Sequence, residues 1–207
     1  FKENPQIAGI LVEPVQGEGG INIAQPEFLK GLQTLCREHN ALFMLDEIQT
    51  GNGRCGSYFA YQRLNATDNA VQPDVITTAK GLGNGMPIGA CLARGKAAEA
   101  FVAGKHGSTF GGNPLACHVA TAVVDTIIEN KLCDKVLALG KIITDNISTK
   151  LDGNTILKEI RQCGLMIGIE LNKPCKDIMQ IGLDNGIVLN VTSVSYTHLT
   201  LPTKSSV

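Results

Sequence analysis

Lys80 stands in a glycine-rich stretch whose composition suits a lysine that attacks a carbonyl group. Glycines occupy positions 81, 83 and 85, and glycine lets a bulky ligand approach the backbone closely. We expect such a pocket to desolvate the ammonium group, lower its pKa and leave part of it as neutral amine. A neutral lysine amine forms Schiff bases with carbonyl compounds. Taken alone, the pattern leaves open an ordinary solvated lysine beside a flexible loop.

A second chemical signal is the pair Asp46 and Glu47, which directly follows an apolar run at 41–45. A carboxylate at the end of a buried strand is costly unless it meets a positive partner. Asp46 could hold the protonated ring nitrogen of pyridoxal phosphate, whose pyridinium is an electron sink. Gln49, one tight turn further on, could then donate to the phenolic oxygen of that cofactor. A helix cap or a metal ligand is the alternative for Asp46.

A competing motif follows at once, because Gly51-Asn-Gly-Arg-Cys-Gly56 matches the dinucleotide fingerprint G-x-G-x-x-G. Asp74 also stands at about the right distance for the ribose contact of that motif. However, the fingerprint turn should open directly from its strand, and Asp46 and Glu47 would repel a pyrophosphate there. The motif therefore gives only weak support to an NAD-binding dehydrogenase.

Buried strands must bring these side chains together. Apolar runs at 7–12, 41–45 and 75–79 predict strands, and the apolar spacing between the first two predicts a helix from Pro26 to about His39. This order is typical of a parallel α/β sheet. Glu13, Asp46 and Lys80 each follow a predicted strand, so they should converge on the edge where such sheets bind ligands.

Downstream, the pattern predicts a smaller α+β unit. Apolar stripes predict helices at 114–127, 132–151 and 178–183, and apolar runs predict strands at 167–171 and 187–189. Asn113 should cap the first of these helices, with Pro114 at its first position. We expect three regions, namely part of a large cofactor-binding domain at 1–130, a truncated small domain at 131–192, and a non-native or disordered tail at 193–207.

Composition limits the classes of function. A formal net charge of −1 argues against a nucleic-acid partner. The seven cysteines are an odd number and include no Cys-x-x-Cys pair, which predicts free thiols in a reducing compartment and no metal site. No apolar run of about 18 residues suggests a membrane span, so we expect a cytoplasmic protein. Because the chain starts at Phe1 and soon enters a strand, it is expected to be a fragment that begins mid-domain.

Four motifs resemble, in order, those of the class III pyridoxal-phosphate aminotransferases, and the resemblance spans residues 1 to about 190. It implies fold type I, an α/β fold with a mainly parallel sheet in the large domain and a truncated small α+β domain. The motifs are Glu13-Pro-Val-Gln-Gly-Glu-Gly-Gly20, Leu45-Asp-Glu-Ile-Gln-Thr-Gly51, Thr78-Ala-Lys-Gly-Leu-Gly-Asn-Gly-Met-Pro-Ile-Gly-Ala90 and His106-Gly-Ser-Thr-Phe-Gly-Gly-Asn-Pro114.

The resemblance implies a role for each residue of the second and third motifs. Lys80 matches the lysine that binds pyridoxal 5′-phosphate covalently and moves a proton during the reaction. Asp46 matches the partner of the pyridinium nitrogen, and Gln49 the partner of the phenolic oxygen. Glu47 and Ile48 complete this cofactor-binding motif, with Ile48 packed on one face of the ring.

The first and fourth motifs imply contacts with substrate and with a second subunit. Thr109 matches the residue that binds the cofactor phosphate of the neighbouring subunit, which implies a homodimer with a shared active site. Ser108 adjoins it and should face substrate. Glu18 matches the glutamate that can pair with the arginine gripping the substrate carboxylate. A merely structural role stays open for Ser108 and Glu18.

Within the class, the motifs most resemble members that act on N2-acetylornithine. The implied reaction moves its terminal amino group to 2-oxoglutarate by a ping-pong route, giving N-acetylglutamate 5-semialdehyde and glutamate for arginine biosynthesis. Enzymes for ornithine, 4-aminobutyrate or succinyldiaminopimelate share Lys80, Asp46 and Gln49 and stay open, as does a non-catalytic fragment. The sequence lacks the family's amino-terminal cofactor segment and carboxy-terminal Arg-Phe-Ala-Pro segment, so we expect the isolated chain to be inactive.

Overall fold

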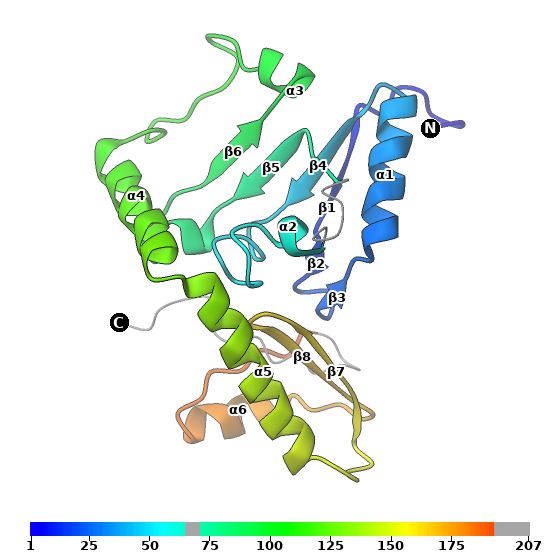
Figure 1. Ribbon diagram of the computed structural model, residues 1–207, viewed down its shortest axis with the longest axis vertical. Coiled ribbons are helices and arrows are strands. Elements are labelled where there is room, and N and C mark those ends of the chain that lie inside the picture. Colours follow the sequence, from blue (N-terminus) through cyan, green and yellow to red (C-terminus); the bar gives the residue numbers. More distant parts are fainter. Residues whose placement is uncertain (65–70, 193–207) are drawn as a thin grey trace.

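A mixed four-stranded sheet dominates the computed structural model, which describes residues 1–64 and 71–192 (Figure 1). The strand order is β1-β4-β5-β6, in which β1, β4 and β5 are parallel and β6 is antiparallel to β5. The predicted α/β fold with a mainly parallel sheet is thus confirmed. The strands are β1 (Gly9–Val12), β4 (Leu42–Asp46), β5 (Val75–Thr78) and β6 (Ala90–Ala93).

Helix α1 (Pro26–Glu38) packs against β1 and β4 and fixes the position of β4 (Figure 1). Leu29 and Cys36 of α1 join Phe43 and Leu45 of β4 in one core cluster, and each of the four side chains is at most 1% exposed. Burying a large apolar side chain stabilises a fold by about 1.5–3 kcal/mol. This packing therefore anchors the strand that ends at Asp46.

Short elements join the sheet to the loops around it. A two-stranded hairpin follows β1, and three short helices interrupt the later connections. Their bounds are β2 (Val15–Gln16), β3 (Asn22–Ile23), α2 (Ala60–Leu64), the 3-10 helix η1 (Lys80–Leu82) and α3 (Lys96–Glu99).

Helices α4 and α5 lead from the sheet to a second layer of the structure, which contains β7, β8 and α6 (Figure 1). The elements are α4 (Pro114–Glu129), α5 (Leu132–Lys150), β7 (Leu157–Cys163), β8 (Met166–Leu171) and α6 (Asp177–Asp184). The predicted cap is confirmed, because the Oδ1 of Asn113 accepts a hydrogen bond from the backbone N of Ala116 at 2.9 Å.

No helix in the described ranges is long and apolar enough to cross a membrane.

Two details of the second layer differ from the prediction. The strand predicted at 187–189 is wrong, because this segment pairs with no described strand and its side chains Ile187 and Val188 are half exposed. Strand β7 goes unpredicted because its sequence is largely polar. The proposed boundary after residue 130 falls between α4 and α5 and stays a prediction. The predicted tail, 193–207, lies outside the described residues.

The β7–β8 hairpin packs directly on loops that leave the main sheet. Cys163 and Met166 share a core cluster with residues of the loops that follow β1 and β4. The backbone N of Leu165 donates to the carbonyl of Arg54 at 3.0 Å. A Cβ at Gly164 would lie 2.6 Å from the carbonyl carbon of Cys55, so glycine allows this close approach. The second layer therefore contacts the loops that form the candidate site.

Candidate active site

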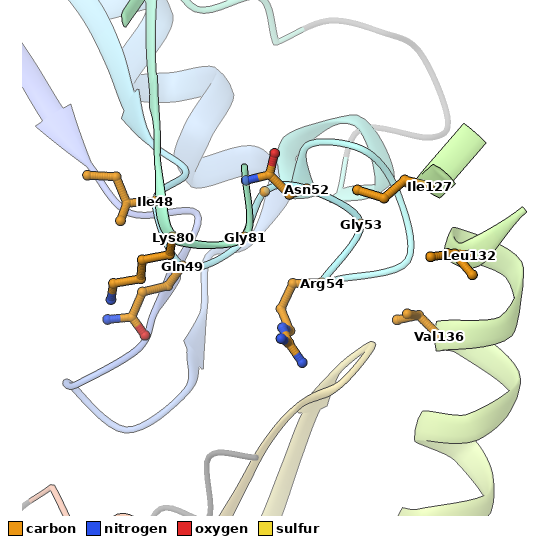
Figure 2. Close-up of a pocket in the computed structure, with 11 residues that line it drawn as sticks. Ile48, Gln49, Asn52, Gly53, Arg54, Lys80, Gly81, Ile127, Leu132 and Val136 are labelled. Atoms are coloured by element: carbon orange, nitrogen blue, oxygen red, sulfur yellow. The ribbon is translucent and has the colours of Figure 1, made fainter. Parts of the chain in front are cut away.

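A pocket of about 170 Å³ opens beyond the carboxyl ends of β4 and β5, as the sheet topology predicts (Figure 2). In Figure 2, Lys80, Ile48 and Gln49 lie on one side, the apolar side chains of α4 and α5 on the other, and Arg54 between them. The residues that line it are Ile48, Gln49, Gly51, Asn52, Gly53, Arg54, Lys80, Gly81, Ile127, Leu132 and Val136.

Lys80 enters this pocket from a strained backbone position. It opens η1 with a φ of 46°, in the left-handed region that is costly for a residue with a Cβ. Such strain concentrates at functional sites. Its side chain is exposed, so the expected desolvation of Lys80 is wrong for this structure. Within residues 1–64 and 71–192, its ammonium group has no hydrogen bond or ion pair.

Asn52 holds the turn that carries Lys80, a role that sequence reasoning missed. Its Nδ2 donates to the Oγ1 of Thr78 at 2.9 Å and to the carbonyl of Ala79 at 3.2 Å. The hydroxyl of Tyr58 donates in turn to Asn52 Oδ1 at 3.2 Å. Asn52 therefore ties the loop after β4 to the strained turn. The Gly-Asn-Gly spacing indicates a turn here, but it gives no sign of this long-range contact.

Asp46 lies at the end of β4, half-buried, outside the set that lines the pocket. Its Oδ1 accepts a hydrogen bond from the backbone N of Ile48 at 3.0 Å, which turns the chain so that Ile48 and Gln49 face the pocket. Across the sheet, Asp46 is in register with Thr77. The Oγ1 of Thr77 is buried and finds no hydrogen-bond partner among the described residues. Unused polar groups thus remain at this strand end.

Glu47 points away from the pocket and supports the loop from behind. It is fully buried, and its carboxylate accepts hydrogen bonds from the backbone N of Ala60 and of Tyr61, both at 2.9 Å, and from the hydroxyl of Thr50. Burial raises the pKa of Glu47, although these hydrogen bonds oppose the shift. These contacts give Glu47 a structural role at the start of α2.

The glycine-rich turn at 17–20, which carries Glu18, packs beside Gln49. The Oε2 of Glu13 accepts a hydrogen bond from the backbone N of Gly17 at 3.0 Å. A Cβ at Gly17 would lie 2.6 Å from the Cδ of Gln49. Glu18 itself is exposed and does not line the Lys80 pocket. Of the first motif, the structure therefore brings the backbone, rather than the Glu18 carboxylate, to the site.

Ser108 and Thr109 lie away from the pocket that contains Lys80. Ser108 lines a separate pocket of about 320 Å³, next to Asn113 at the start of α4, and Thr109 is exposed. The fold of this chain alone does not bring these two residues to the Lys80 pocket.

Arg54 is a second cation in the Lys80 pocket that sequence reasoning assigned to no role. Burial lowers the pKa of Arg54, and its guanidinium has no carboxylate partner in the described part of the chain. The dinucleotide reading of this loop fails on geometry, because Gly56 does not open a helix and α2 starts only at Ala60. A fingerprint loop must deliver its pyrophosphate to a helix N-terminus.

Known proteins resemble this chain over most of its length. The family model described as "Aminotransferase class-III" matches residues 1–202. An acetylornithine aminotransferase of Nitrosomonas europaea is 45% identical over 196 residues, which cover 95% of this chain and 49% of that protein. Solved structures also match the fold, among them two in which 97% of this chain is covered. The ornithine aminotransferase of Plasmodium yoelii has a TM-score of 0.86 at 33% identity, with 53% of its chain covered. The acetylornithine aminotransferase of Elizabethkingia anophelis has a TM-score of 0.83 at 35% identity, with 50% covered.

The chain spans about half the length of the relatives it matches. Within that half, the family match includes the loop after β4, the Lys80 turn and the start of α4. The sequence matches and the fold matches point to the same family. The chain belongs to the class-III aminotransferase family.

Proposed function

We propose that this chain forms the lysine-bearing part of a pyridoxal-phosphate-dependent aminotransferase that moves the terminal amino group of N2-acetylornithine to 2-oxoglutarate. The observation that carries the proposal is Lys80, held at a φ of 46° in a pocket that Gln49 also lines, with no described partner for its ammonium group. Relatives named acetylornithine aminotransferase, at 41–45% identity, support the choice of substrate.

The residues present fit pyridoxal phosphate. Asp46 presents a carboxylate for a protonated ring nitrogen, Gln49 an amide for a phenolic oxygen, and Ile48 an apolar surface for the ring. The unpartnered Oγ1 of Thr77, in register with Asp46, leaves a polar group free for a ligand at this strand end. Glu47 would assist by fixing the loop rather than by direct contact. When bound, the cofactor supplies an electron sink for carbanion chemistry.

Lys80 carries the proton-transfer role in this proposal. Its Nζ would hold the cofactor covalently, and as a free amine it would take a proton from the amine-bearing carbon of the substrate and return it. The exposed position of Lys80 leaves its amine accessible from the pocket. Arg54 adds positive charge to the same pocket, which favours substrates that carry carboxylates.

The proposal includes a homodimer in the cytoplasm. Ser108 and Thr109 lie away from the Lys80 pocket of their own chain. This separation agrees with a role for Thr109 at the cofactor phosphate of a partner subunit, with Ser108 and Glu18 near the substrate. Mixing two inactive variants, Lys80→Ala and Thr109→Ala, should restore part of the activity if sites are shared. No recovery on mixing would contradict the shared site.

The proposed function is tested by measuring which amine donor the protein prefers. The protein containing this chain, loaded with cofactor, would be assayed with 2-oxoglutarate and each of acetylornithine, ornithine, 4-aminobutyrate and succinyldiaminopimelate. We expect kcat/KM for acetylornithine to exceed the others by at least about tenfold, a difference that pocket contacts commonly supply. A higher kcat/KM for another amine would change the proposed substrate but would still support an aminotransferase. Inactivity with every amine would contradict the proposal.

A further inference from the structure

Arg161 of β7 forms a side-chain link between the second layer and the loop that follows β1. Its Nε donates a hydrogen bond to the carbonyl of Gly20 at 2.9 Å. Its Nη1 donates to Oε2 of Glu170 on β8 at 2.6 Å and also contacts Glu159. The side chain of Arg161 is only 15% exposed, and that of Glu170 only 6%. The guanidinium is therefore fixed on several sides and can hold the Gly20 carbonyl in place.

The turn that Arg161 holds is anchored at both of its ends. Val15 and Ile21 are fully buried in the cluster that also contains Cys163 and Met166. The backbone N of Ile21 donates to the carbonyl of Gln16 at 2.8 Å. Between these anchors, three of the four residues at 17–20 are glycines, which have no side chain to pack. Polar contacts therefore help to hold the turn, and Arg161 of β7 supplies one of them.

The same turn lies against the pocket. Gly17 packs its backbone on the side chain of Gln49, with the Gly17 Cβ position 2.6 Å from the Gln49 Cδ. Gln49 lines the pocket that contains Lys80. A displacement of the turn would open space beside Gln49 and release its amide group. The contacts thus run in an unbroken series from Arg161 through the turn to Gln49.

We propose that Arg161 is a positioning residue for the Lys80 site. By holding the carbonyl of Gly20, it keeps the turn at 17–20 packed against Gln49 and so orders the Gln49 amide at the pocket wall. The inference rests on the proposed function, because it describes how the cofactor-binding loop is ordered. It assigns Arg161 no contact with substrate or cofactor.

The chemistry of the link explains why an arginine occupies this position. A planar guanidinium can donate in several fixed directions at once, whereas the ammonium of lysine is a point charge on a flexible stem. Arg161→Lys therefore keeps a cation near the buried Glu170 carboxylate while losing the directed hydrogen bond to Gly20. Lys158 also pairs with Glu170, on the same carboxylate as Arg161. Lys158→Gln is thus the matched control, since it weakens the ion pair and leaves Arg161 in place.

The first readout needs no cofactor. Amide hydrogen exchange would be measured on the segment 15–21 of wild type, Arg161→Lys and Lys158→Gln. We expect at least about fivefold faster exchange in Arg161→Lys because this bond no longer restrains the turn, and wild-type exchange in Lys158→Gln. Unchanged exchange in a folded Arg161→Lys protein would overturn the link.

The second readout is the absorption band of the cofactor-loaded protein, followed against pH, together with KM and kcat for the amine donor. We expect Arg161→Lys to shift the pH midpoint of the band and to raise KM severalfold, while Lys158→Gln leaves both unchanged. An unshifted band with normal KM in Arg161→Lys would overturn the role in positioning. If Arg161→Lys does not fold, Gly17→Ala is measured instead. This variant keeps Arg161 but displaces the Gln49 side chain. An unshifted absorption band in Gly17→Ala would overturn the proposal.

Different results would contradict the proposed function and the positioning role of Arg161. Absence of the band in wild-type protein would contradict the proposed function, and the exchange measurement would still decide whether Arg161 holds the turn. A normal wild-type band that Arg161→Lys leaves unchanged would contradict only the inference about Arg161.

Discussion

Gly17 leaves no room for a side chain against Gln49, because a Cβ at position 17 would overlap the Oε1 of Gln49 and lie 2.6 Å from its Cδ. The two residues belong to loops that follow different strands, β1 and β4. Their contact places a glycine-rich turn directly against a wall of the Lys80 pocket. Glycine at this position therefore serves close approach, since Gly17 is not among the glycines with positive φ.

Gly17→Ala should disturb the site more than the fold. The added methyl group meets the movable end of the Gln49 side chain, so we expect a loss of stability below about 1.5 kcal/mol. The displaced amide should weaken cofactor binding severalfold. Thermal unfolding and titration with pyridoxal phosphate would separate the two effects. Cofactor affinity equal to wild type would contradict the position assigned to Gln49.

Gly140→Ala should destabilise the protein, although alanine normally favours a helix. A Cβ at Gly140, inside α5, would overlap the carbonyl oxygen of Gly164 and lie 3.0 Å from its carbonyl carbon. Overpacking of this kind costs about 1–3 kcal/mol. Gly31→Ala in α1 is the matched control, because no atom lies within 4 Å of its Cβ position, and it should stabilise by about 0.5–1 kcal/mol. Denaturant unfolding of both variants would test this contrast, and equal shifts would contradict it.

Glu47→Ala should reduce stability strongly. It removes the acceptor for the backbone N–H groups of Ala60 and Tyr61 and for Thr50, and it leaves these groups without a partner in a buried place. We expect a loss of about 3–5 kcal/mol. Glu47→Gln keeps one acceptor oxygen and should lose about half as much. If the free energy of unfolding of Glu47→Ala stayed near that of wild type, the supporting role of Glu47 would be refuted.

The Glu170 carboxylate should make stability depend on pH in the acid range. Hydrogen bonds from Lys158 and Arg161 hold the pKa of Glu170 below its ordinary value of 4.5. A carboxyl whose pKa is lower in the fold stabilises it above the unfolded pKa and loses that contribution as pH falls through the folded pKa. The difference in unfolding free energy between wild type and Glu170→Gln should therefore be largest above about pH 5.5 and shrink on acidification. A difference that grew as pH fell would contradict the ion pair.

The sheet was accessible to prediction where strands are apolar and buried. The runs that became β1, β4 and β5 are apolar or β-branched and end at polar residues, so both their existence and the edge they point to could be inferred. Strand β6, Ala-Cys-Leu-Ala, has no alternation of polar and apolar residues and no β-branched residue. Strand β7 is polar because its charged side chains pair with those of β8. Such strands are defined by their partners rather than by their own sequence.

The candidate site also has features that local sequence predicts and features that depend on distant partners. The local motifs, together with their resemblance to the family, were enough to predict that Lys80, Ile48 and Gln49 share one pocket. The exposure of Lys80 and the inward direction of Glu47 depend on packing between distant segments, which a single sequence does not reveal. The same holds for Arg161, whose bond to Gly20 joins residues that are 141 positions apart.

Covalent binding of the cofactor by Lys80 is tested most directly by reducing the cofactor-loaded protein with borohydride and mapping its peptides. We expect one pyridoxyl group, located on Lys80 and absent from Lys80→Ala. Lys96→Ala, a control at an exposed position of α3, should be labelled like wild type. A label on another lysine, or none in the loaded wild-type protein, would contradict covalent binding at Lys80.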